Sequence, residues 1–90
     1  MSAILPPGEL MAEYIEVAMR EAVYEILEDD GSHYGEIPGL PGVYANADSL
    51  EECRLLLREV LEGWIILGLE LNHPIPVLQS IDLTPKEKII

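Results

Sequence analysis

The sequence predicts a small α+β domain in which a long helix packs on one face of a three-to-four-stranded, mainly antiparallel sheet. Two segments, one near the N-terminus and one in the second half, carry apolar residues at helical spacing. Between them lie short segments rich in β-branched and aromatic residues, separated by glycine, proline and aspartate turn signals. The expected order is therefore α-β-β-β-α-β.

The first helix is expected over about residues 9–21, because Pro6, Pro7 and Gly8 interrupt the chain just before it. One side of this segment is acidic and the other is apolar, which is typical of an amphipathic helix. The apolar positions are Leu10, Met11, Tyr14, Ile15, Ala18 and Met19. Acids in the first turn also favour the helix, since they interact well with its N-terminal dipole.

Three short strands should follow this helix. Residues 23–27 and 33–37 read as a β-hairpin around the turn signal Asp29–Ser32. Pro38 ends the second strand, because proline has no N–H to contribute to a ladder. Residues 43–47, "VYANA", form the third strand.

The second helix begins after Ser49, which with Glu52 has the spacing of a capping box. One apolar stripe is expected to face the sheet, and further apolar residues make the C-terminal half of this helix apolar nearly all round. The stripe consists of Leu50, Cys53, Leu57, Val60 or Leu61, and Trp64. The second apolar side needs cover from the N-terminal helix or from another subunit. Gly68 or Asn72 is expected to end the helix, and Pro74 prevents its continuation.

The last elements are an edge strand and a tail. The segment "PIPVLQSIDL", from Pro74 to Leu83, is predicted to be a proline-interrupted edge strand. Residues 84–90 are expected to form a tail. We therefore expect one domain over residues 1–90, with its core over about residues 22–83.

The charge of the chain limits the classes of partner. Seventeen acids and five bases give a formal net charge of −12. Such a chain repels a phosphate backbone, so autonomous nucleic-acid binding is not expected. The acidic surface favours encounter with a basic protein, although acids also keep a small protein soluble.

Features of the termini and the cysteine count indicate a cytoplasmic protein. Cys53 is the single cysteine and has no partner for an intramolecular disulfide. The first residues lack the basic region of a signal peptide. The longest apolar run, "WIILGLEL", is too short to span a membrane and contains Glu70, so no membrane association is expected.

The search for catalytic and ligand-binding motifs favours an architectural role for the glycine-rich stretch. Gly35, Gly39 and Gly42 match neither the dinucleotide spacing nor a P-loop, and acids occupy the following helix start. We instead expect glycines for positive φ or close approach, and prolines that stiffen the loop. The aromatic residues Tyr34, Tyr44 and Trp64 are expected in a core or an interface.

No metal site, cofactor or catalytic activity is expected. His33, His73 and Cys53 lack metal-ligand spacing, and the acids of residues 28–30 lack the spacing of a calcium loop. Ser32 and His33 are adjacent, but no nucleophile motif surrounds them.

Residues 24–65 resemble the HicB-like antitoxin family. The matching features are a strand that ends in an acidic turn, the stretch "YGEIPGLPGVYA", the helix entry "SLEEC" and an amphipathic helix, while "PIP" at residues 74–76 fits the last strand of the family. The resemblance implies a partial RNase H-like fold with three antiparallel strands, a helix and a fourth strand. It also implies neutralisation of a small basic, mRNA-cleaving HicA-like toxin. The carboxylate set of RNase H enzymes is not recognisable, so the resemblance does not imply nuclease activity.

Two departures from the family pattern are expected. Many members carry a C-terminal DNA-binding domain, for which this chain leaves no room after the last strand. The N-terminal helix over about residues 9–21 is an addition to the common pattern, and it either covers apolar surface or makes a dimer contact.

The residues predicted to contact a toxin are the turn acids Glu28, Asp29 and Asp30 and the strand residue Glu36. The alternative interpretation is that these acids form only a solvated edge. Trp64, Ile65 and Leu67 are predicted to anchor either the core or a homodimer. A second functional hypothesis follows from them, namely an orphan homo-oligomeric interaction module without a toxin.

Overall fold

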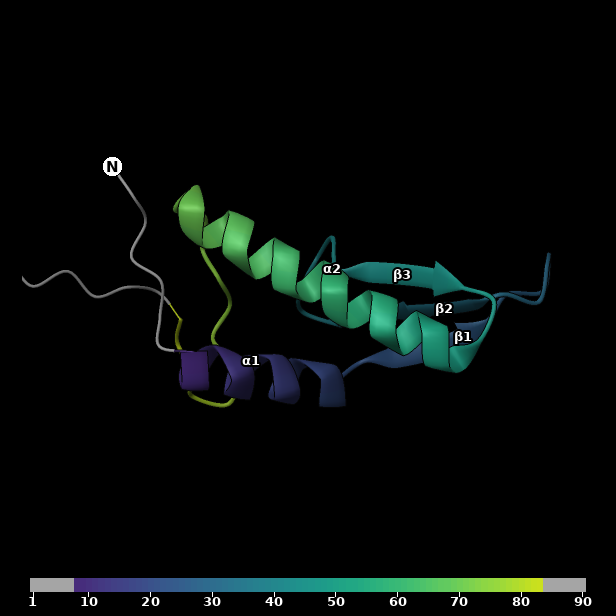
Figure 1. Cartoon of the computed structure of the whole chain (residues 1–90), viewed down its shortest axis with the longest axis horizontal. Helices are drawn as coiled ribbons and strands as arrows, with labels where there is room; N and C mark the ends of the chain where they lie inside the picture. Colours follow the sequence, from purple (N-terminus) through teal and green to yellow (C-terminus); the bar gives the residue numbers. More distant parts are fainter. Residues whose placement is uncertain (1–7, 84–90) are drawn as a thin grey trace, which may run out of the picture.

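The fold is α+β, as the sequence predicted, and it was obtained as a computed structural model that describes residues 8–83 (Figure 1). Two helices, α1 (Gly8–Arg20) and α2 (Leu50–Glu70), enclose in sequence the strands β1 (Val23–Ile26), β2 (His33–Glu36) and β3 (Tyr44–Ala47). These bounds agree with the expected first helix, hairpin and third strand to within a few residues.

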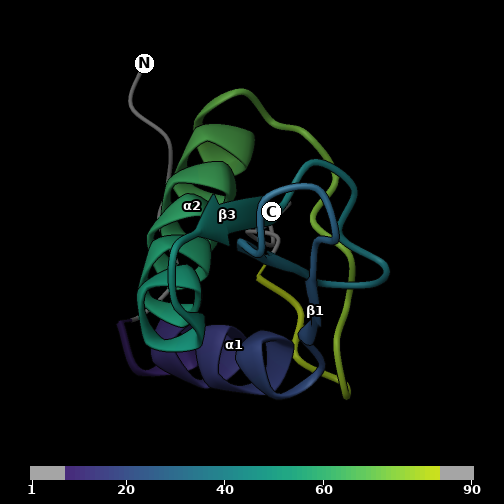
Figure 2. The same cartoon turned by 90° about the vertical axis from the view of Figure 1, so that its right-hand side faces the viewer.

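The three strands form one antiparallel sheet in the order β1-β2-β3. Helix α2 lies along one face of this sheet (Figure 2). Its Cys53 thiol contacts the Ala45 carbonyl at 3.6 Å. A Cβ atom added at Gly35 would lie 3.2 Å from the Cys53 sulfur and 2.7 Å from the Tyr24 ring. The glycine at this position therefore permits the close approach of helix and sheet, one of the two roles expected of these glycines.

A single hydrophobic core lies between α1, α2 and the covered face of the sheet. Helix α2 contributes one stripe of buried side chains to this core. Further buried side chains come from β3 and the loop before it, and others come from α1. Its fully or nearly fully buried members are Tyr14, Ile15, Ala18, Ile37, Leu40, Val43, Ala45, Cys53, Leu57, Leu61, Ile65, Leu69, Ile75 and Leu83. Helix α1 is thus an integral part of the core and covers one side of α2.

Both ends of α2 have identifiable caps. The Ser49 hydroxyl accepts a hydrogen bond from the Glu52 N–H at 3.1 Å and donates one to the Glu52 carboxylate at 2.9 Å. In a standard capping box the glutamate carboxylate accepts from the backbone N–H of the N-cap residue. Here the Glu52 carboxylate accepts from the Ser49 hydroxyl instead. At the other end, Asn72 takes a φ of +57° and the His73 N–H donates to the Gly68 carbonyl at 2.8 Å, as in a Schellman motif.

The predicted edge strand after α2 is wrong. Residues 74–83 run from the end of α2 back to α1 without joining the sheet (Figure 2). Their regular pairing is limited to the isolated bridge between Leu78 and Ile81. This segment is instead held by packing, because Ile75 and Leu83 are buried in the core. The Tyr14 hydroxyl also donates a hydrogen bond of 2.5 Å to the Pro76 carbonyl. The tail predicted for residues 84–90 lies outside the described residues.

Candidate protein-interaction surface

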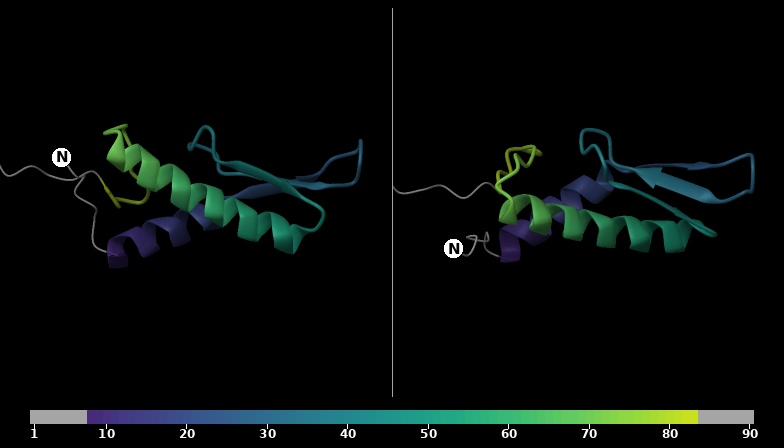
Figure 3. Two further views of the ribbon diagram at one scale, coloured as in Figure 1. Left: turned by 45° about the horizontal axis from the view of Figure 1, so that its top comes forward. Right: turned by 90° about the horizontal axis from the view of Figure 1, so that it is seen from above.

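One face of the sheet has no described helix over it. In Figure 3, right, α2 runs along the opposite face. Side chains alternate along a strand, and Gly35 faces α2. The uncovered face therefore carries one set of alternate residues from each strand. This open face consists of Val23, Glu25, Tyr34, Glu36, Tyr44 and Asn46.

Two tyrosines stack at the centre of the open face. Tyr34 and Tyr44 lie on neighbouring strands, and their ring centroids are 6.2 Å apart with an angle of 27° between the rings. This places both tyrosines on the same face of the sheet. The Tyr44 side chain is 58% exposed, so one side of this aromatic pair faces solvent.

Carboxylates flank the tyrosine pair on the same face. Glu36 lies opposite Tyr44 in the β2–β3 register, and Glu25 lies opposite Tyr34 in the β1–β2 register. Desolvation and the carboxylate of Glu36 raise the pKa of Tyr34, and Tyr44 and Glu25 raise it further. The open face is therefore both aromatic and anionic.

A hollow of about 270 Å³ adjoins this group, lined by Tyr34, Glu36, Tyr44 and the loop 37–43. Two consecutive turns form the loop. The Leu40 N–H donates to the Ile37 carbonyl at 3.1 Å, and the Val43 N–H donates to the Leu40 carbonyl at 3.1 Å. Gly39 and Gly42 have φ values of +88° and +94°. Proline followed by a positive-φ glycine is the signature of a type II turn, so the glycine-rich stretch is a rigid rim of the hollow.

The hairpin turn places its three acids at a different location from Glu36. Residues 27–32 join the Ile26–His33 end of the hairpin, whereas Glu36 pairs with Val23 at the other end. Glu28 and Asp29 are exposed there.

Asp30 has a structural role in the turn. Its carboxylate accepts hydrogen bonds from the Ser32 hydroxyl at 2.6 Å and the Ser32 N–H at 2.9 Å. These bonds lower the pKa of Asp30. The Asn46 amide donates to the Ser32 hydroxyl at 2.8 Å, so the turn is also tied to β3.

The structure thus separates Glu36 from the three turn acids and places it beside Val23 and Tyr44. Glu25 was not among the predicted residues. It was detectable from the sequence, because strand alternation places Glu25 on the face of β1 opposite Tyr24. The cross-strand register, which depends on the sheet and its turns as a whole, then places Glu25 opposite Tyr34.

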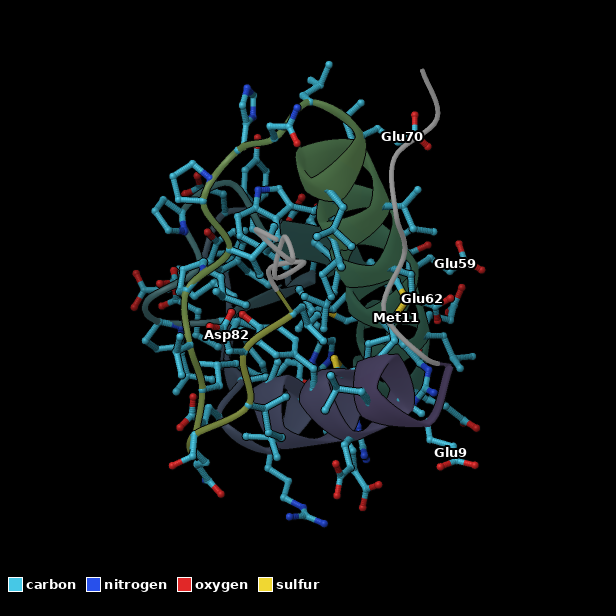
Figure 4. All side chains as sticks on the ribbon, turned by 90° about the vertical axis from the view of Figure 1, so that its left-hand side faces the viewer. Glu9, Met11, Glu59, Glu62, Glu70 and Asp82 are labelled. Carbon is cyan, nitrogen blue, oxygen red and sulfur yellow. The ribbon has the colours of Figure 1, made fainter. Side chains whose placement is uncertain are left out.

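Trp64, Ile65 and Leu67 occupy three different environments. Ile65 is buried in the core, and Trp64 is half-buried against it. Leu67 is 56% exposed on the outside of α2. Glu59, Glu62 and Glu70 also lie on α2 and point away from the body of the molecule (Figure 4). Of the three residues, Ile65 is a core anchor and Leu67 is available to a partner.

A larger open groove of about 610 Å³ lies between the C-terminal end of α1 and the start of α2. It is lined by Met19, Leu50, Glu51, Arg54, Leu55 and Arg58. Both arginines have intramolecular partners. Burial raises the pKa of Tyr24, and the Arg54 guanidinium beside it offsets part of the rise. Arg58 pairs with Glu62 at 3.4 Å.

Within residues 8–83, no group of three or more histidine, cysteine, aspartate or glutamate side chains is arranged to hold a metal ion. Cys53 is buried, and burial raises the pKa of its thiol. Neither helix of the described chain is long and apolar enough to cross a membrane.

Comparisons with known proteins give a family and a structural relative. A family model described as UPF0150-like matches residues 13–76. The match begins inside α1, so part of this helix belongs to the UPF0150-like pattern. Among solved structures, TTHA0281 from Thermus thermophilus is similar to the chain, with 37% identity and a TM-score of 0.79. The similarity covers 87% of this chain and 96% of that one. None of the curated proteins compared with the chain matches it.

Proposed function

The chain belongs to the UPF0150-like family, and from this premise we propose that it is a HicB-like antitoxin or antitoxin-derived protein. It would bind a small basic, mRNA-cleaving HicA-like toxin and neutralise it by covering its active surface. Its own role would be non-catalytic and cytoplasmic. The UPF0150-like family is related to the HicB-like antitoxins, which supports this proposal together with the resemblance of residues 24–65.

The open face of the sheet is the observation that carries the proposal. It has two carboxylates and a stacked tyrosine pair, and none of its described side chains is basic. A cationic protein surface complements such a face, and the net charge of −12 would speed the encounter. Aromatic residues are enriched among those that dominate binding energy at interfaces.

Co-expression with the product of the neighbouring reading frame tests the function. We expect a short basic toxin whose expression arrests growth, restoration of growth by this chain, and co-purification of the two proteins. The double variant Glu25→Gln, Glu36→Gln should weaken the complex, whereas Glu59→Gln, Glu70→Gln on α2 removes the same charge and serves as its control. An unrelated neighbour, with no toxin bound at low or physiological salt, would contradict the proposal.

The alternative function, a homo-oligomeric interaction module, is favoured by one specific feature of α2. Leu56 and Leu67 lie at helical spacing and are exposed, and Val60, on the same side of the helix, is only partly buried against the core. A second copy would bury this seam in a two-fold contact. Sedimentation should then show a dimer that Leu67→Asn dissociates and Leu55→Asn does not. A monomer at micromolar concentration in high salt would remove this alternative.

A further inference from the structure

The chemistry of the partner contact can be assigned from three side chains of the open face. We propose that Tyr34, Glu36 and Tyr44, here called the tyrosine–glutamate site, receive an arginine side chain of a partner protein. The proposal rests on the proposed function only for the identity of that partner, and it concerns what the site itself recognises.

The tyrosine pair supplies an aromatic surface for a cation. The rings are 6.2 Å apart, which leaves no space for a guanidinium between them. The Tyr44 ring is mostly exposed, so a guanidinium stacks on its outer side. Cations are attracted to the face of an aromatic ring within about 6 Å of its centre.

Glu36 supplies the counter-charge at the right place. It lies directly opposite Tyr44 in the register, and side chains in such pairs have Cβ atoms about 4.5–5.5 Å apart. A guanidinium on the Tyr44 ring is therefore within reach of the Glu36 carboxylate. Glu25, opposite Tyr34 on the other side of the pair, adds a second negative charge.

The protein does not supply this cation itself within the described residues. All three described arginines lie on the helices, and two of them pair with helix glutamates, as Arg20–Glu16 and Arg58–Glu62. Glu36 therefore has no cationic side chain of residues 8–83 bound to it. Charge complementarity favours a partner that brings one.

The aromatic ring and the carboxylate together favour arginine over lysine, and the adjoining hollow has room for the side chain. A volume of about 270 Å³ accommodates a planar guanidinium and its stem. Guanidinium groups stack on aromatic faces and form two parallel bonds to a carboxylate, whereas an ammonium is a strongly hydrated point charge. The two turns of residues 37–43 hold the rim in place before binding, which reduces the entropic cost of association.

A titration of the full chain with N-acetyl-argininamide, followed by amide chemical shifts in NMR spectra, tests the site. We expect saturable shifts that centre on Tyr34, Glu36, Tyr44 and the loop 37–43. The neutral isostere N-acetyl-citrullinamide should produce much smaller shifts at the same concentrations. N-acetyl-lysinamide should bind roughly two- to fivefold more weakly than the arginine derivative.

Variants distinguish binding at the tyrosine–glutamate site from general attraction of a cation to the negatively charged protein. Glu36→Gln and Tyr44→Leu should each weaken binding by roughly two- to fivefold. Glu70→Gln, which removes one charge at the far end of α2, should leave binding unchanged. Equal shifts from the arginine, lysine and citrulline derivatives, or an equal loss in Glu36→Gln and Glu70→Gln, would overturn the proposal. Preserved spectra show that each variant is folded.

The experiments can refute the proposed arginine site and the proposed antitoxin function independently of each other. Toxin neutralisation that survives in Glu36→Gln and Tyr44→Leu, with no arginine binding, would overturn the site and leave the function standing. Arginine binding without any toxin partner would remove the function and leave the site standing.

Discussion

At the scale of single residues, Tyr14 joins two parts of the chain that are distant in sequence. Its ring is fully buried, and its hydroxyl bonds to the Pro76 carbonyl at 2.5 Å. Burial and then the charge of Glu21 raise the pKa of Tyr14 to about 12, from 10.0. The hydrogen bond between Tyr14 and the segment after α2 therefore exists only while the Tyr14 hydroxyl is protonated.

The first prediction concerns alkaline pH. Because the folded-state pKa of Tyr14 is raised, its contribution is fully present below about pH 10 and is lost as pH rises through about 12. The loss amounts to at most about 2.7 kcal/mol in the free energy of unfolding. Urea unfolding followed by circular dichroism between pH 8 and 12 measures it.

The Tyr14→Phe variant completes this test. At pH 8 it should cost about 1–3 kcal/mol, since the Pro76 carbonyl loses its donor. Its stability should fall less than that of the wild type between pH 10 and 12. Tyr44→Phe on the open face is the control. Parallel pH profiles of Tyr14→Phe and the wild type would refute the assignment.

The second prediction compares two glycines that are both buried. A methyl group at Gly35 would lie 2.7 Å from the Tyr24 ring and 3.2 Å from the Cys53 sulfur, both constrained between sheet and helix. Gly35→Ala should therefore cost about 1–3 kcal/mol. At Gly68 the close contact is with the end of the Ile75 side chain, which can rotate. Gly68→Ala should cost clearly less in denaturant unfolding, and a reversed order would contradict this account.

At the scale of elements, the sequence predicted those structures whose signals are local. The periodicity of α1, the hairpin around Asp29–Ser32 and the Ser49 cap all depend on residues within a few positions of one another. The strand expected at residues 74–83 failed because its apolar residues pack into the core without pairing. Its turn has Gln79 and Ser80 at φ values of +44° and +70°. Neither residue is a glycine, asparagine or aspartate, the residue types that usually mark a positive φ in a turn.

The third prediction concerns the two turns of residues 37–43. Gly39→Ala and Gly42→Ala should each destabilise the protein by about 1 kcal/mol, because alanine is strained at positive φ. Gly63→Ala in α2 should act in the opposite direction by about 0.5–1 kcal/mol, because a helix interior favours alanine and the site is open. Thermal unfolding of the three variants measures the difference. Stabilisation by Gly39→Ala or Gly42→Ala would exclude the turn geometry.

The tyrosine–glutamate site shows where prediction from sequence ends. Tyr34, Tyr44 and Glu36 were each identified from the sequence, as were the turn acids. Their grouping depends on the register of β2 with β1 and β3, which places Glu25 opposite Tyr34 and moves Glu28 and Asp29 to the other end of the hairpin. Register is set by the whole sheet and its turns, so the residue types were predictable and the site was not.

At the scale of the whole molecule, self-repulsion dominates the electrostatics. The chain carries a net charge of −12. The ion pairs Arg20–Glu16 and Arg58–Glu62 are exposed i,i+4 pairs on helices, and such pairs contribute about 0.3–0.5 kcal/mol each. A basic partner would relieve this repulsion, which links the stability of the free protein to its proposed function.

The fourth prediction follows from that balance. Salt screens the repulsion among many acids and also weakens the two ion pairs, but the first effect is larger because the acids greatly outnumber the pairs. The melting temperature of the free chain should therefore rise between about 10 mM and 200 mM sodium chloride, a range over which the Debye length falls from about 30 Å to below about 10 Å. A variant with Glu13→Gln, Glu59→Gln and Glu70→Gln should start from a higher melting temperature at low salt and rise less. A melting temperature that falls with salt would mean that specific ion pairs, rather than net charge, govern the stability of this protein.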